Sequence, residues 1–353
     1  MDGKQLVAQL FDGAIDIVGD VHGEIDALRN LLARLGYSPQ GEHAEGRRLV
    51  FVGDLCDRGP NSPAVILLVK QLVERGLAQC LIGNHELNLL RDSPKNGNGW
   101  FFTPDHDQAR GHFLHCCAVD PARREAMQQF IASLPLALER EDVRVVHAAW
   151  IPESIAAIRQ AEAMDAVTLY EHHEWRIEQL MRDSGMKQAV TEELKRYGAQ
   201  LNNPEAVMPF LPMLAQYDQG YQMGNPVRVA TSGVEQRNDH AFFVGGKWRM
   251  VRRVAWWHDY QDSVPVVMGH YWRCLDADTQ HLVNRAEKDL FDAHAAGDWL
   301  GPNRNVYCVD FSVGGRYKER DLGRTDHWGT HLAAVRWPER EVVFDDGMRL
   351  ALS

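Results

Sequence analysis

Short apolar runs that end in polar clusters recur along the chain. Each run is rich in Val, Ile or Leu and has the length of a buried β-strand. This strand-then-helix order is typical of α/β folds, in which ligands bind beyond the carboxyl ends of the strands. The runs are Ile15–Val18, Leu49–Val52, Cys80–Ile82, Val143–Val146 and Val264–Met268. Two of them are followed by helical faces, Leu28, Leu31, Leu32 and Leu35 after the first and Val65, Leu68, Val69 and Leu72 after the second.

The C-terminal part lacks such crossover helices. A run at Val306–Val309 is followed by His331–Trp337, which turns at residues 338–340 into Val342–Phe344, the pattern of a hairpin. These strands predict mixed sheets, and we expect two that pack together.

A long stretch separates His147 from His270. The pattern of this stretch predicts helices around Ile155–Ser184 and Thr191–Tyr197 and a turn-rich segment over Leu201–Pro226. We therefore expect a single domain over residues 1–353, with a largely helical insertion or cap over residues 151–245.

Composition narrows the class of protein. The chain has 353 residues, 45% of them hydrophobic and 25% charged, which is ordinary for a soluble globular protein. Because 38 Lys and Arg face 49 Asp and Glu, the net charge is −11, and neither general nucleic-acid binding nor membrane binding is expected. An anionic substrate then needs local cations or metal ions. The spacing of the six cysteines and the lack of a signal-peptide pattern predict a cytoplasmic protein with reduced thiols.

Polar residues that can bind metals follow the predicted strands. Taken singly, each is explained as a turn former or a helix cap. Together they offer carboxylate, amide and imidazole ligands, a set that favours Mn, Fe or Zn over Mg or Ca. Six ligands are too many for one ion with an open position, so two ions that share a bridging carboxylate are expected. The set is Asp20, His22, Asp54, Asn84, His147 and His270.

The segments around these residues carry a family resemblance. Gly19-Asp20-Val21-His22-Gly23, residues 53–59 (GDLCDRG) and Gly83-Asn84-His85-Glu86 are followed by His147-Ala148 and Gly269-His270. In this order the motifs resemble the calcineurin-like metallophosphoesterases, in particular the bacterial branch of the phosphoprotein phosphatase family. The resemblance covers residues 15–90 and short segments near 147, 270 and 305–345. It implies an α/β fold, a four-layer α/β/β/α sandwich of two mixed sheets with a largely helical insertion.

The resemblance also implies a role for each residue. Asp20 and His22 would bind the first metal, Asp54 would bridge, and Asn84, His147 and His270 would bind the second. The resemblance thus implies two divalent metal ions, with Mn as the first candidate and Fe or Zn as alternatives. Such a pair activates water for attack on phosphorus. His85 would protonate the leaving oxygen, Asp57 would orient His85, and Arg58 would hold the phosphate.

The sequence predicts the substrate less closely than it predicts the metal site. The family supplies a second phosphate-binding arginine between the last two histidine ligands, and Arg252 or Arg253 fits this position best, with a solvated side chain as the alternative for each. The aromatic residues near His270 either pack in the core or form a stacking wall for the substrate. They are Trp256, Trp257, Tyr260, Tyr271 and Trp272.

The predicted function is that of a dinuclear metal-dependent phosphatase acting on phosphomonoesters. The leading hypothesis is a phosphoserine/phosphothreonine protein phosphatase, because the resemblance to tetraphosphatases is weakened by Glu86, where those enzymes commonly have Asp. The alternative is a dinucleoside polyphosphate hydrolase, so the partner is a phosphorylated protein or a small phosphorylated substrate. A hypothesis from another class is an inactive metal-binding scaffold, against which His85, Asp57 and Arg58 argue.

Overall fold

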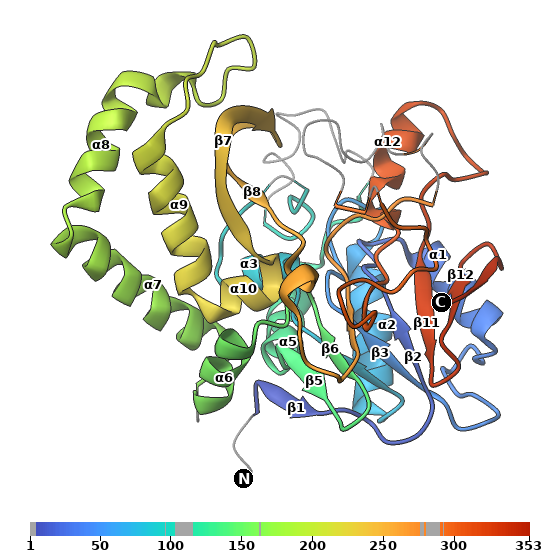
Figure 1. Ribbon diagram of the computed structural model, residues 1–353. Coiled ribbons are helices and arrows are strands. Elements are labelled where there is room, and N and C mark those ends of the chain that lie inside the picture. Colours follow the sequence, from blue (N-terminus) through green and yellow to red (C-terminus); the bar gives the residue numbers. More distant parts are fainter. Residues whose placement is uncertain are drawn as a thin grey trace.

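Two mixed sheets stand at the centre of the molecule in the computed structural model (Figure 1). The structure describes residues 5–353 except 96, 103–115, 162–163, 276–278, 280–289 and 292. One sheet has the order β1 (Val7–Gln9), β5 (Ala137–Glu139), β6 (Arg144–Val146), β9 (Val266–Met268) and β10 (Val306–Cys308). The other has the order β13 (Arg349–Ala351), β12 (Glu341–Phe344), β11 (Ala333–Trp337), β2 (Ile15–Val18), β3 (Arg48–Phe51) and β4 (Ala78–Cys80).

The two sheets pack face to face. Ile17 of β2 and Val50 of β3 lie in one apolar cluster with Val145 of β6 and Val267 of β9, and all four are fully buried. The outer face of the second sheet is covered by α1 (Ile25–Leu35) and α2 (Ser62–Glu74), whose apolar sides join the main core. The central strands β2, β3, β6 and β9 are therefore buried on both faces, which explains their continuous apolar runs in the sequence. The predicted four-layer α/β/β/α fold class is confirmed.

β2 shows what a buried polar residue requires. Asp16 is fully buried within this strand. Its carboxylate accepts hydrogen bonds from Arg47 at 2.8 Å and from the Tyr37 hydroxyl at 2.7 Å, so the charge is paired. The strand can thus remain in the centre of its sheet.

Helices continue the chain between the strands and form the insertion. After β4 come α3 (Asn84–Leu90) and α5 (Pro121–Ala132), and α12 (Arg316–Asp321) follows the short helix η3 (Val313–Gly315). The insertion, at the left of Figure 1, contains α6 (Pro152–Gln160), α7 (Ala166–Asp183), α8 (Met186–Tyr197), η1 (Gly198–Gln200), α9 (Pro212–Gly224) and α10 (Pro226–Ser232). No helix in the described part of the chain is both long and apolar enough to span a membrane.

The turn-rich reading of Leu201–Pro226 is wrong, because α9 occupies residues 212–224. Pro212 suits the first turn of a helix, and Leu214 and Ala215 are buried against Met250. Gly220 permits close packing within this helix, because a Cβ there would lie 2.3 Å from Met181 of α7. After α10 the chain forms a two-stranded sheet of β7 (Glu235–Val244) and β8 (Lys247–Arg253), and its turn lies at the expected end of the insertion.

Trp257, in the short helix η2 (Trp256–Asp259), belongs to the core. Its side chain is fully buried, and its ring stacks on Phe291 with centroids 5.3 Å apart. Trp257→Ala should therefore lower the free energy of unfolding by about 3 to 5 kcal/mol, the cost of a large aromatic cavity. Chemical denaturation measures this loss. A change in substrate preference without loss of stability would contradict the core assignment.

Candidate metal centre and active site

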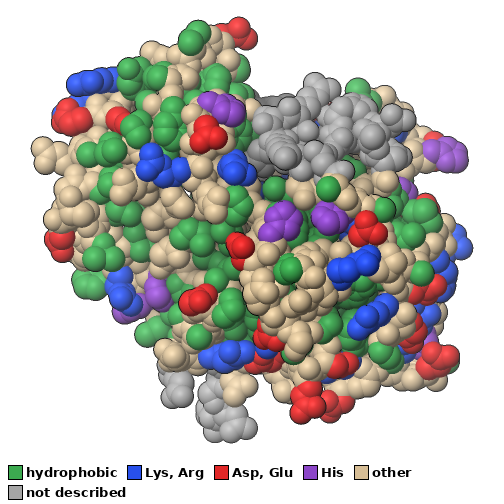
Figure 2. Space-filling model, viewed as in Figure 1, with side chains coloured by type: hydrophobic (Ala, Val, Ile, Leu, Met, Phe, Trp, Pro, Cys, Tyr) green, Lys and Arg blue, Asp and Glu red, His purple; other side chains and the backbone are tan. Residues whose placement is uncertain are grey.

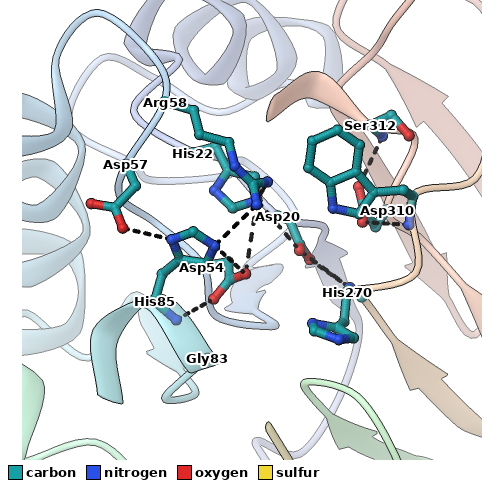
Figure 3. Close-up of polar contacts among 12 residues, drawn as sticks. Asp20, His22, Asp54, Asp57, Arg58, Gly83, His85, His270, Asp310 and Ser312 are labelled. Carbon is teal, nitrogen blue, oxygen red and sulfur yellow. Dashed lines mark hydrogen bonds and ion pairs between the residues drawn. The ribbon is translucent and has the colours of Figure 1, made fainter. Parts of the chain in front are cut away.

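The predicted site residues meet at the carboxyl ends of strands from both sheets (Figure 3). Asp20 and His22 follow β2, Asp54 follows β3, and His270 follows β9. His22, Asp54 and His270 have φ angles of 47°, 49° and 73°, in the left-handed region that non-glycine residues seldom adopt. Asp57 and Arg58 both have φ of 71°. Such a concentration of unfavourable backbone angles is typical of functional sites.

Two glycines allow the strand ends to approach. A Cβ on Gly83 would lie 2.2 Å from Oδ1 of Asp54, and one on Gly269 would lie 2.0 Å from Oδ1 of Asp20. Both positions therefore exclude any larger residue, which explains why a glycine precedes Asn84 and His270 in the motifs.

Asp54 is the centre of the arrangement. Its buried carboxylate oxygen Oδ2 lies 3.4 Å from Nε2 of His147 and 3.8 Å from Nε2 of both His22 and His85. Two groups of potential ligand atoms share it: His22, Asp54 and His85 form one, and Asp54, His147 and His270 form the other. A bridging position for Asp54 fits this geometry.

The Nδ1 hydrogen bonds of two imidazoles turn their Nε2 atoms toward the Asp54 cluster, although Nε2 of His22 accepts from Arg58 in this structure. Nδ1 of His22 lies 2.9 Å from the carbonyl oxygen of Cys56, and Nδ1 of His147 lies 3.0 Å from that of Val52. Because a carbonyl only accepts, Nδ1 carries the proton in both rings, and a neutral ring then has its lone pair on Nε2. Nε2 of His147 lies 3.4 Å from Oδ2 of Asp54 and 3.2 Å from Oδ1 of Asn84, so either a proton on Nε2 or a metal ion in its place would meet two oxygen acceptors.

Two further observations fit a metal ion at these residues. Nε2 of His270 is buried without a hydrogen-bond partner, which is costly unless a ligand takes its lone pair. Burial and the neighbouring Asp310 raise the pKa of Asp20 well above its usual value, so the side chains around this carboxylate do not compensate for the loss of water.

The histidines differ in the direction of their pKa shifts. Burial lowers the pKa of His147, but Asp54 more than offsets this and raises the value to about 10. Burial, together with Arg58, lowers the pKa of His22 well below its usual value, and burial together with Arg253 does the same for His270. These two rings are therefore neutral at pH 7, the form that binds metals.

His85 makes the contacts expected of an acid. Nδ1 of His85 lies 2.6 Å from Oδ2 of Asp57, and Asp57 is fully buried. Arg58 donates to Nε2 of His22 at 2.9 Å and lies 3.2 Å from Nε2 of His85. The structure thus brings Asp57, Arg58 and His85 against the Asp54 cluster, as Figure 3 shows.

Three supporting residues were not found from the sequence. Trp100 donates from Nε1 to Oδ1 of Asp57 at 2.6 Å. The buried carboxylate of Glu86 accepts from the backbone N–H groups of Asp54 and Leu55, each at 2.8 Å, and so holds the turn that carries Asp54. The Trp272 ring lies over Arg58, with its centroid 4.4 Å from the guanidinium carbon. Only the proximity of Glu86 to Asn84 in the motif hinted at any of these contacts.

The two candidate arginines differ in position. Arg252 is exposed, whereas Arg253 is half-buried and close enough to His270 to lower its pKa. The aromatic residues divide as well: Trp256, Tyr260 and Tyr271 are buried, and Trp272 is only half-buried. Of these aromatic residues, Trp272 lies over Arg58, and Tyr271 packs edge-on against the His270 ring with centroids 5.3 Å apart.

The Trp100 contact leads to a prediction. Trp100→Phe keeps the ring but leaves Asp57, a fully buried carboxylate, without one donor. We expect a loss of stability of about 1 to 3 kcal/mol, the cost of an unsatisfied buried group. Denaturation of Trp100→Phe beside the parent measures it, and equal stability would show that the indole N–H contributes nothing.

Comparison with known proteins agrees with this geometry. The asymmetrical bis(5'-nucleosyl)-tetraphosphatase PrpE of Oceanobacillus iheyensis is 50% identical over 80 residues, which are 22% of this chain and 32% of the relative. PrpE of Bacillus subtilis is 44% identical over 81 residues, 22% of this chain and 33% of the relative. The chain therefore spans about a third of the length of these curated relatives.

Solved structures give a likeness of overall shape. A cold-active protein-tyrosine phosphatase of a psychrophilic Shewanella has a TM-score of 0.48 at 17% identity and covers 99% of this chain and 84% of its own. A putative diadenosine tetraphosphatase has a TM-score of 0.41 at 16% identity, with 98% and 95% covered. The family model of the calcineurin-like phosphoesterases matches residues 13–212, more than half of the chain. On that match, and with the predicted resemblance confirmed, this chain belongs to the calcineurin-like phosphoesterase family.

Proposed function

We propose that the chain hydrolyses phosphoric esters with two divalent metal ions, Mn first among the candidates. The observation that carries the proposal is the placement of Asp54, which two groups of buried ligand atoms share beside Arg58 and the His85–Asp57 pair. Asp20, His22 and Asp54 would hold one ion, and Asp54, Asn84, His147 and His270 the other. When bound, such ions neutralise the phosphoryl oxygens and generate the attacking nucleophile from water.

The remaining steps belong to residues of this chain. Arg58, planar and permanently charged, binds the phosphoryl group, and the Trp272 ring holds its guanidinium plane. His85 donates a proton to the leaving oxygen. Asp57 keeps the Nδ1 proton in place and orients the ring, and Trp100 fixes Asp57 in turn. Arg253 is the candidate for the second phosphate contact.

For the substrate we propose a dinucleoside polyphosphate. The support is the set of relatives named as bis(5'-nucleosyl)-tetraphosphatases, whose similarity covers 80 residues of this chain. A phosphoserine or phosphothreonine protein is the second candidate, favoured by the motif Gly83-Asn84-His85-Glu86.

A panel of substrates tests both. Protein loaded with Mn²⁺ is assayed with p-nitrophenyl phosphate, a dinucleoside tetraphosphate and a phosphoserine peptide, and its metal content is measured. We expect bound metal, hydrolysis of p-nitrophenyl phosphate and a higher kcat/KM for the tetraphosphate than for the peptide. A preference for the peptide would favour the second candidate. Bound metal without hydrolysis of any substrate would favour the remaining hypothesis, that of an inactive metal-binding scaffold.

A further inference from the structure

The β7–β8 hairpin concentrates positive charge near the metal centre. Its two strands carry five Lys and Arg but only two Asp and Glu, although the chain as a whole has a net charge of −11. Within the described residues, the side chains of these five cations form no ion pair or hydrogen bond. Buried arginines elsewhere are paired, as Arg47 is with Asp16. The hairpin cations are Arg237, Lys247, Arg249, Arg252 and Arg253.

The register of the hairpin places four of the cations on one face. Side chains of directly paired residues share a face, and successive residues alternate between faces. Met250 and Trp248 belong to the face that packs with α9. Arg249 and Val251 therefore lie on the other face. Its paired positions are Arg253 with Glu235, Val251 with Arg237, Arg249 with Phe242, and Lys247 with Val244.

These four residues form a row that begins at the metal centre. The inner end lies at Gly233, two residues before β7, where a Cβ would lie 2.1 Å from the hydroxyl oxygen of Tyr271, the neighbour of His270. Arg253 pairs with Glu235 at this end of the hairpin. At about 3.3 Å per residue along a strand, Arg249 lies about 13 Å farther along and Lys247 about 20 Å. Figure 1 shows the hairpin rising beside α9, away from the two sheets. Glu235, at the inner end, is the carboxylate paired across the strands on this face, and the carboxyl of Asp218 in α9 lies near the two outer cations, Lys247 and Arg249.

We propose that this row, Arg253, Arg237, Arg249 and Lys247, binds the phosphate groups beyond the one being cleaved, so that a nucleoside polyphosphate lies along the hairpin. The inference rests on the proposed function and extends it to the recognition of the substrate. The cations stand about 7 Å or more apart along the strands, so they would attract the phosphate chain electrostatically and reach it with long side chains, not match its phosphates one to one. Phe242, half-buried opposite Arg249, offers an aromatic ring to a nucleobase, which an acidic peptide would not require.

The test compares two substrates on variants of the outer cations. In the double variant Arg249→Gln/Lys247→Gln, kcat/KM for a dinucleoside tetraphosphate should fall by about tenfold or more, as expected for lost charged hydrogen bonds. Hydrolysis of p-nitrophenyl phosphate, which has only one phosphate, should not change. The tetraphosphate effect should shrink at high salt, because exposed charges are screened.

Two controls make the result specific. Arg123→Gln removes an exposed arginine of α5 and should alter neither substrate, whereas Arg58→Ala should weaken both alike. The parent must be active on the tetraphosphate. If the ratio of the two kcat/KM values is then unchanged in the double variant, the inference is overturned and the proposed function is not affected. A loss confined to an acidic phosphopeptide would overturn the nucleotide assignment. A metal-loaded parent that hydrolyses none of the substrates would instead refute the proposed function.

Discussion

Asp54→Asn is expected to abolish hydrolysis and to reduce the bound metal to one ion or fewer. Oδ2 of Asp54 lies within 3.8 Å of the Nε2 atoms of three histidines, and two ligand groups share this carboxylate. An amide lacks the negative charge that compensates two cations and bridges them poorly. Asn tolerates the left-handed backbone at this position, where φ is 49°, so the turn should survive.

Metal content and activity are measured on the same preparation. Asp262→Asn is a matched control, since Asp262 pairs with Arg144 at the opposite end of the β6–β9 strand pair and should leave both ions in place. Two ions retained at full activity in Asp54→Asn would contradict the bridging assignment.

The parts of the site that the sequence predicted are those fixed by local structure. Asp20 and Asp54 stand where the paired strands β2 and β3 end and therefore meet, and His270 stands where β9 ends in the sheet packed against them. The strand runs were placed within a residue or two because they are buried on both faces and therefore continuously apolar. Ile15–Val18 coincides with β2.

The missed parts depend on contacts between distant segments. Trp100 reaches Asp57 from 43 residues away, and nothing in its neighbourhood indicates that contact. The choice between Arg252 and Arg253 depends on which face of β8 packs against α9, and the sequence does not reveal this. Residues 212–224 were predicted as part of a turn-rich segment, whereas they form α9, which packs against Met250 and, through Gly220, against Met181. In each case the outcome is determined by packing between distant segments and not by the local sequence.

His85→Asn should retain both metal ions and reduce kcat by roughly 10² to 10⁴, the usual worth of a positioned proton donor. The motif resemblance leaves His85 off the metal, yet its Nε2 lies 3.8 Å from Oδ2 of Asp54, within a group that could hold an ion. The two roles predict different metal contents. Loss of one ion in His85→Asn would identify the residue as a ligand, and retention of both would favour the acid.

The leaving group separates the acid role from a general disturbance of the site. p-Nitrophenolate leaves with little protonation, so the loss in His85→Asn should be small for p-nitrophenyl phosphate and large for an alkyl phosphate. Asp57→Asn should show the same dependence on the leaving group, because Oδ2 of Asp57 lies 2.6 Å from Nδ1 of His85 and acts through it. Equal losses for good and poor leaving groups in both variants would mean that the pair positions the phosphate or the metals and donates no proton.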